Sequence, residues 1–171
     1  KKNDVILAIP SSGLHSNGYS LVRHILKKNK INKKNKKNLF INIKKELIKP
    51  TKIYVKEINK LNKNKLINGC ANITGGGLIN NLTRIIPKNL CINIHLDKIK
   101  TTNIFKWLKK NNISDSEMLK TFNCGVGFCL VANKKNVKKI KNIFSSKYKP
   151  YQIGFISKSR FNIKTYGKLK W

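Results

Sequence analysis

The sequence predicts a mixed β-sheet with α-helices packed on it. Short apolar runs typical of strands alternate along the chain with segments whose apolar residues recur at helical spacing. One run, Val5–Pro10, is apolar throughout and ends in proline, as a strand covered on both faces would be. With 171 residues, of which 40% are hydrophobic, the chain can bury a core, and we expect residues 1–171 to form a single domain.

The first part of the sequence predicts one strand, two loops and two helices. After Val5–Pro10 comes a polar, glycine-bearing loop, and apolar residues then recur at helical spacing over residues 19–26. Residues 27–37 hold seven lysines and three asparagines, and we expect a solvated loop there. A second helical stretch opens at Pro50-Thr51, and its expected apolar side consists of Ile53, Val55, Ile58 and Leu61.

The rest of the chain predicts five more strands and four short helices. Apolar or alternating runs predict strands at residues 69–73, 90–96, 126–131, 151–156 and 161–166. Helical spacing predicts helices over 78–86, 104–108 and 137–144. Ser114-Asp115-Ser116-Glu117 has the form of a capping box at the start of another helix, which gives two of the six carboxylates a structural role.

The chain is strongly basic, with 38 Lys and Arg against 6 Asp and Glu and a net charge of +32. Such a charge is typical of nucleic-acid-binding proteins. However, 35 of the 38 basic residues are lysine, which with asparagine uses A- and T-rich codons. Because phosphate recognition would be expected to use arginine forks as well, we interpret the charge as codon bias and do not expect a nucleic-acid partner.

Other features argue against a membrane protein and a metalloprotein. No run of about eighteen apolar residues is present, and the amino terminus lacks the length and cleavage site of a secretion signal. We therefore expect a cytoplasmic protein with no membrane partner. The cysteines form no C-x-x-C and have no histidine at ligand spacing, so we expect buried thiols and no metal site at Cys70, Cys91, Cys124 and Cys129.

Three loops rich in small residues stand at strand ends or helix starts, where free backbone N–H groups can bind anions. We expect them to converge on one face of the domain. In the second loop, Thr74-Gly75-Gly76-Gly77, glycines allow close approach of a ligand, although a tight turn without a ligand explains them as well. The third loop, residues 121–127, contributes Asn123, Gly125 and Gly127, and by composition it could be only a bulge.

The first loop, residues 10–20, follows the strand Val5–Pro10. Serine and asparagine there can be simple helix caps. His15 is more informative, because an imidazole titrates near neutrality and suits proton transfer. The candidate binding residues of this loop are Ser11, Ser12, Gly13, Asn17 and Gly18.

Taken together, these segments resemble a known enzyme family. The run 4–23, the motif Pro-Thr-Lys-Ile-Tyr-Val at 50–55, Ile-Thr-Gly-Gly-Gly-Leu at 73–78 and Thr-Phe-Asn-Cys-Gly-Val-Gly at 121–127 are similar, in the same order, to the carboxy-terminal half of the aminoimidazole ribonucleotide (AIR) synthase family. This family is also named phosphoribosylformylglycinamidine cyclo-ligase. The resemblance covers residues 4–156.

The resemblance implies a fold and a reaction. The fold is α+β, a three-layer α/β/α domain with a mixed sheet, joined to an amino-terminal half, absent from this chain, that forms a homodimer. The reaction belongs to purine biosynthesis: ATP phosphorylates the formamide oxygen of formylglycinamidine ribonucleotide, and an internal nitrogen closes the imidazole ring. In this scheme residues 74–77 hold a phosphate, Ser11, Ser12 and Asn17 orient the substrate, and His15 carries the proton.

Two departures from the family pattern matter. Asn72 stands where the family usually has histidine before Ile-Thr-Gly-Gly-Gly, and asparagine cannot titrate. The resemblance also implies that the Mg²⁺-binding acidic residues and much of the ATP site belong to the amino-terminal half. The six carboxylates of this chain offer no convincing Mg²⁺ site, and the isolated chain is expected to be inactive. A basic nucleic-acid-binding module and a degenerate, non-catalytic assembly domain remain as alternatives.

Overall fold

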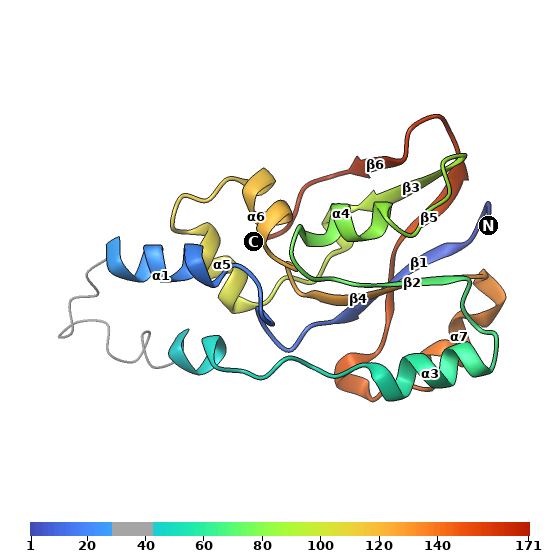
Figure 1. Ribbon diagram of the computed structural model, residues 1–171, viewed down its shortest axis with the longest axis horizontal. Coiled ribbons are helices and arrows are strands. Elements are labelled where there is room, and N and C mark those ends of the chain that lie inside the picture. The colour runs from blue at the N-terminus through green and yellow to red at the C-terminus, as the bar shows by residue number, and fades with distance from the viewer. Residues whose placement is uncertain (29–42) are drawn as a thin grey trace.

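A computed structural model describes residues 1–28 and 43–171 of the chain (Figure 1). Its strands form one sheet in the order β2-β4-β1-β5-β3-β6. Neighbouring strands are antiparallel except β3 and β6, which are parallel, so the predicted mixed sheet is confirmed. The strands are β1 Val5–Pro10, β2 Gly69–Asn72, β3 Leu90–His95, β4 Val126–Ala132, β5 Tyr151–Lys158 and β6 Ile163–Tyr166.

Strand β1 lies in the middle of the sheet and is buried on both faces, as its uninterrupted apolar sequence predicts. Successive side chains of a strand point to opposite faces. Ile6 and Ala8 accordingly belong to one hydrophobic core, while Val5, Leu7 and Ile9 belong to the other. The sheet is therefore covered on both sides.

Helices cover both faces, which confirms the three-layer α+β arrangement. The larger core lies under α1, α4, α5 and α6, and the smaller core under α3 and α7. In Figure 1, α3 and α7 lie on the opposite side of the view from β6. The helix bounds are α1 Tyr19–Lys28, α3 Val55–Lys63, α4 Gly77–Thr83, α5 Asn103–Lys109, α6 Asp115–Thr121 and α7 Val137–Lys141; the short 3-10 helices are η1 Leu96–Lys98, η2 Lys134–Asn136 and η3 Ser146–Tyr148.

The prediction of a helix from Pro50 was wrong in its start and in part of its apolar side. Helix α3 begins at Val55, and residues 50–54 have no regular secondary structure. The Lys52 backbone N–H donates to the Ser12 hydroxyl at 3.1 Å, a contact that holds this segment outside the helix. Ile53 is consequently 74% exposed and Val55 61% exposed, whereas Leu61 is buried as expected.

Other local predictions have mixed outcomes. The Ser114 side chain accepts a hydrogen bond from the Glu117 backbone N–H, which confirms the cap. In a complete capping box the Glu117 carboxylate would accept from the Ser114 N–H, but here it accepts from the Thr121 hydroxyl. Lys27 and Lys28 end helix α1, while the rest of the predicted lysine-rich loop lies outside the described residues.

Three of the four cysteines are buried free thiols, as predicted, while Cys70 is only half-buried. Burial, with a smaller effect of the Asp115 charge, raises the pKa of Cys124 to about 12, so this thiol stays protonated. In the part of the chain that the structure describes, no helix has the length and apolar character needed to cross a membrane.

Candidate functional site

Asn123 joins the third loop to the first. Its side chain is fully buried. The Asn123 Oδ1 atom accepts hydrogen bonds from the Ser11 hydroxyl at 3.2 Å and from the Gly125 backbone N–H at 2.9 Å. Its Nδ2 atom donates to the Gly13 carbonyl at 2.9 Å. The Asn123 amide therefore holds the two loops together. The Ser11 hydroxyl, predicted to orient substrate, is engaged in this hydrogen-bond network.

His15 lies at the bend of the first loop and is 6% exposed. Its φ of 57° is in the left-handed region, which non-glycine residues adopt at sharp turns. Nε2 accepts a hydrogen bond of 3.2 Å from the Ser12 backbone N–H. Burial lowers the pKa of His15 below its usual value. The imidazole is therefore neutral at physiological pH and carries its proton on Nδ1.

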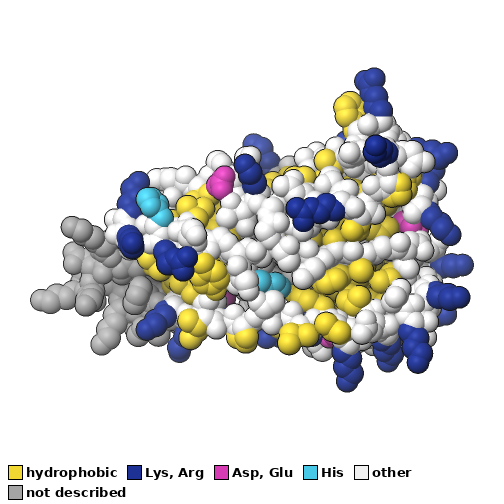
Figure 2. All heavy atoms as spheres, viewed as in Figure 1, with side chains coloured by type: hydrophobic (Ala, Val, Ile, Leu, Met, Phe, Trp, Pro, Cys, Tyr) yellow, Lys and Arg dark blue, Asp and Glu magenta, His cyan; other side chains and the backbone are white. Residues whose placement is uncertain are grey.

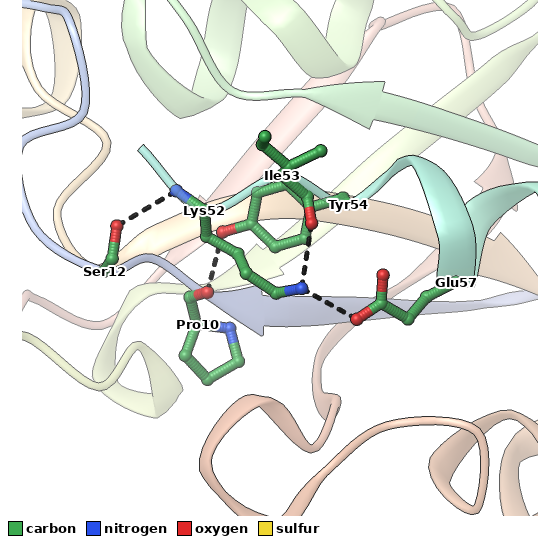
Figure 3. Close-up of polar contacts among 6 residues, drawn as sticks. All are labelled: Pro10, Ser12, Lys52, Ile53, Tyr54 and Glu57. Atoms are coloured by element: carbon green, nitrogen blue, oxygen red, sulfur yellow. Dashed lines mark hydrogen bonds and ion pairs between the residues drawn. The ribbon is translucent and has the colours of Figure 1, made fainter. Parts of the chain in front are cut away.

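Residues 50–54 pack directly against the first loop (Figure 3). The Ser12 hydroxyl donates to the Pro50 carbonyl at 2.7 Å and accepts from the Lys52 N–H at 3.1 Å. The Tyr54 hydroxyl donates to the Pro10 carbonyl at 2.8 Å. The hydroxyl of Ser12, predicted to orient substrate, is thus engaged in holding this segment.

The charge of Lys52 is neutralised within the segment. Its Nζ atom lies 2.7 Å from the Glu57 carboxylate and donates to the Ile53 carbonyl at 2.8 Å (Figure 3). It also lies over the rings of Tyr54 and Tyr148, at 5.5 and 5.2 Å from their centroids. Partial burial alone would raise the pKa of Glu57, but the hydrogen bond from Lys52, assisted by a backbone hydrogen bond and the charges of Lys52 and Lys56, lowers it.

The second loop is organised by Asn81 of helix α4, a residue that sequence reasoning missed. Its Nδ2 atom donates to the Gly77 carbonyl at 2.7 Å and lies 3.3 Å from the carbonyls of Thr74 and Gly75. Gly77 has a φ of 68°, and a Cβ atom there would lie 1.8 Å from the Leu119 carbonyl oxygen. Turn geometry and the packing of α4 on α6 therefore require this glycine, while Thr74 and Gly75 stay exposed.

The three loops converge, as predicted. A Cβ atom on Gly75 would lie 3.7 Å from Asn17 Oδ1, which places the second loop beside the first. A Cβ on Gly18 would lie 2.1 Å from the Phe122 ring, and one on Gly127 would lie 2.7 Å from His15 Cε1. These close approaches explain why glycine stands at positions 18 and 127, and they bring the first and third loops into contact.

A cavity of about 350 Å³ opens beside residues 50–55. The rings of Tyr54 and Phe128 contribute to its wall, with centroids 5.4 Å apart, and Asn72 at the end of β2 lines it as well. Burial, with smaller effects of nearby ionisable groups, raises the pKa of Tyr54, so its hydroxyl is a neutral donor. Hydrophobic side chains gather in the middle of the face shown in Figure 2, whereas Lys and Arg lie mainly around its edge.

The residues of this site do not fit a magnesium ion. In residues 1–28 and 43–171, no three His, Cys, Asp or Glu side chains lie together in a way that could hold a metal. Several carboxylates already have structural partners. Asp4 accepts a hydrogen bond from the Asn68 side chain, Glu57 pairs with Lys52, and Asp115 pairs with Lys109.

Comparison with known proteins gives consistent matches. Residues 1–164 match the family described as "AIR synthase related protein, C-terminal domain". The chain is 40% identical over 167 residues to the phosphoribosylformylglycinamidine cyclo-ligase of Ligilactobacillus salivarius, covering 95% of this chain and 48% of that protein. It is 41% identical over 167 residues to the protein of the same name from Fusobacterium nucleatum, covering 92% and 48%. The chain thus spans about half the length of these curated relatives.

Solved structures share the fold at low sequence identity. PurLQS from Thermotoga maritima superposes with a TM-score of 0.61 at 12% identity, over 100% of this chain and 25% of that one. Thiamine monophosphate kinase from Aquifex aeolicus gives a TM-score of 0.55 at 14% identity, over 99% and 52%. At these identities the likeness concerns the fold alone.

Proposed function

The chain belongs to the AIR synthase related protein family as its C-terminal domain, and on that premise we propose that it supplies the carboxy-terminal half of a phosphoribosylformylglycinamidine cyclo-ligase. One observation carries this proposal. The segments that resemble the cyclo-ligases lie far apart in sequence, yet Asn123, Ser12 and Gly75 bring them together at one site. The comparisons give no support to a nucleic-acid-binding module.

The proposed reaction is ATP-dependent ring closure of formylglycinamidine ribonucleotide to aminoimidazole ribonucleotide. ATP transfers its γ-phosphoryl group to the formamide oxygen and leaves as ADP. An internal nitrogen then attacks the activated carbon, the carbon–oxygen bond breaks, and inorganic phosphate leaves as a proton is lost from the attacking nitrogen. Such chemistry depends mainly on positioning and on groups that stabilise negative charge.

We assign roles to this chain's residues within that reaction. Thr74 and Gly75, exposed at the second loop, are proposed to hold a phosphate, and Asn17 beside them to orient the ribonucleotide. His15 is proposed to take the ring-closing proton on Nε2, because burial keeps the imidazole in the neutral form that a base requires. Nε2 accepts the Ser12 N–H, so this role requires that hydrogen bond to open when the proton is taken. Ser11, Ser12 and Asn123 position these groups through their hydrogen bonds.

The ATP-binding residues and the homodimer contacts are proposed to lie in the amino-terminal half that the curated relatives contain. The described carboxylates of this chain do not gather at the site, so any Mg²⁺ is proposed to be held by the amino-terminal half. The working enzyme is proposed to act in the cytoplasm as a two-half protein.

Reconstitution tests the proposal. The chain is mixed with, or joined to, the amino-terminal half of the Ligilactobacillus salivarius relative, and ATP-dependent formation of aminoimidazole ribonucleotide is measured. We expect product from the combination, none from the chain alone, and a lower rate with His15→Ala. No product from a well-folded combination would refute the proposed function, while turnover by the chain alone would refute the division of roles between the halves.

A further inference from the structure

Two apolar side chains project from the segment that borders the site. Ile53 is 74% exposed and Val55 is 61% exposed, while Tyr54 between them is only 5% exposed. Tyr54 points inward to Pro10, and Ile53 points away from it (Figure 3). The exposure of Ile53 and Val55 is therefore a consequence of how Tyr54 anchors the segment.

The surface they form is rigid and electrically neutral. The Ser12 hydroxyl donates to the Pro50 carbonyl and accepts from the Lys52 N–H, and the Tyr54 hydroxyl donates to the Pro10 carbonyl, so the backbone is fixed. The only charged side chain between residues 50 and 55, Lys52, is paired with Glu57. Ile53 and Val55 line the cavity of about 350 Å³, and Ile58 and Phe128 contribute further apolar wall. We call Ile53, Val55 and this cavity the apolar rim.

Contiguous exposed apolar surface next to a functional site marks an interface more often than isolated exposed residues do. A preformed surface also binds at a lower entropic cost than a flexible one. On a chain with a net charge of +32, a neutral apolar patch is a surface that a folded protein domain can cover without burying unpaired charge. This favours a protein partner over nucleic acid at this position.

We propose that the apolar rim is the docking surface for the amino-terminal half present in the curated relatives. This chain accounts for 48% of the length of the Ligilactobacillus salivarius relative, so a polypeptide of similar size is available to cover it. The rim is joined to the His15 loop through Ser12, so a domain docked there would bring its own residues to the site. This inference rests on the proposed function, because it assumes that the working enzyme contains a second half.

Cysteine labelling tests the proposal directly. Ile53→Cys and Val55→Cys are made in the chain alone and in the chain joined to the amino-terminal half of the Ligilactobacillus salivarius relative, and the rate of alkylation by iodoacetamide is measured. Phe161→Cys is the matched control, because Phe161 is 51% exposed on the β5–β6 connection, outside the rim. We expect the joined half to slow labelling at positions 53 and 55 by about tenfold or more, since interface cores exclude water, and to leave position 161 unchanged.

A second measurement covers the case in which the joined protein folds poorly. The separate halves are mixed, and their association is measured by sedimentation with the chain as it is and with Ile53→Gln/Val55→Gln. We expect the double substitution to weaken association about tenfold or more, with Phe161→Gln without effect. Equal labelling in the presence and absence of the second half, no association, or association unaffected by the double substitution would each overturn the docking proposal. Association through the rim without product formation would instead refute the proposed function alone.

Discussion

The backbone N–H of Ser12 donates a hydrogen bond of 3.2 Å to Nε2 of His15, and the Ser12 hydroxyl bonds to the backbone at Pro50 and Lys52. One residue therefore links the candidate base to the segment that carries the apolar rim. The hydrogen bond also requires a neutral imidazole, because a protonated Nε2 would present a hydrogen atom to the donating N–H. This relationship has consequences for pH dependence and for stability.

The stability of the domain should depend on the ionisation of His15. Burial lowers its pKa in the folded state below the ordinary value of 6.5, so the unfolded chain binds the proton more readily. The contribution of His15 is therefore fully present above pH 6.5 and is lost as pH falls through the folded pKa. Urea unfolding of the chain and of His15→Gln, at about pH 7.5 and about pH 5.5, measures this.

We expect the free energy of unfolding to fall more between these two pH values in the unsubstituted chain than in His15→Gln. His24 and His95 are present in both proteins and cancel in the difference. Glu57, whose pKa is lowered from 4.5, titrates at lower pH and does not contribute in this window. An equal loss in both proteins would show that His15 is not the buried neutral group described above.

Asn123→Ala should destabilise the domain strongly. The substitution leaves the Ser11 hydroxyl, the Gly125 N–H and the Gly13 carbonyl without their buried partner. Each unsatisfied buried polar group costs about 1–3 kcal/mol. Partial relaxation of the loops makes the total cost smaller than the sum for three groups, so we expect the free energy of unfolding to fall by about 3 kcal/mol.

Asn133→Ala is the matched control for this measurement, because the Asn133 side chain accepts an exposed hydrogen bond from the Lys135 N–H. Its loss should be about 1 kcal/mol or less, the ordinary cost of an exposed cap. Similar losses in the two variants would contradict the role of Asn123 as the link between the loops.

Ser12→Ala should loosen residues 50–54 without unfolding the core. It removes the hydrogen bonds to the Pro50 carbonyl and from the Lys52 N–H, and we expect a stability loss of about 1–2 kcal/mol. Amide hydrogen exchange at residues 52–55 should become faster, while exchange in strand β1 stays slow. Ser16→Ala, which loses only a 3.4 Å contact with the Thr51 hydroxyl, should change neither. Unchanged exchange in Ser12→Ala would argue against this link.

Much of the fold follows from local patterns in the sequence, but the site contacts do not. The apolar run of β1 and the Ser114 cap depend on neighbouring residues, and both are confirmed. The Ser12 hydroxyl, by contrast, meets the Pro50 carbonyl across 38 positions of the chain. Helical spacing assigned Ile53 to a buried face, because no local signal shows that this contact delays the start of helix α3.

The site residues also divide into those that local sequence patterns indicate and those that only the fold brings together. Glycines at 75, 76 and 77 and the polar residues of the first loop could be recognised from composition, and their convergence from their positions at the ends of elements. The role of Asn81 could not, because asparagine within a helix is usually exposed, and only the fold brings its amide under the second loop. Tyr54 was not among the predicted site residues. It lies in the motif at 50–55, which formed part of the family resemblance, so this motif could have indicated it.

Gly77→Ala and Gly75→Ala should separate the structural role of the second loop from its proposed phosphate-binding role. A Cβ atom on Gly77 would lie 1.8 Å from the Leu119 carbonyl oxygen at a φ of 68°, so we expect a stability loss of about 2–5 kcal/mol. A Cβ atom on Gly75 would meet only Asn17 Oδ1 at 3.7 Å, an ordinary contact, and its effect on stability should stay within about 0.5 kcal/mol.

In the reconstituted two-half enzyme, however, Gly75→Ala should raise KM for the ribonucleotide or for ATP, because the added methyl group stands where a phosphate would approach the backbone. Thermal unfolding measures the first effect and steady-state kinetics the second. Thr83→Ala serves as the control, since the Thr83 hydroxyl donates to the Asn80 carbonyl near the end of α4, away from the exposed loop. If Gly75→Ala leaves both KM values unchanged while the enzyme is active, the exposed part of the second loop does not bind phosphate, and its glycines serve the turn and the packing of α4 on α6 alone.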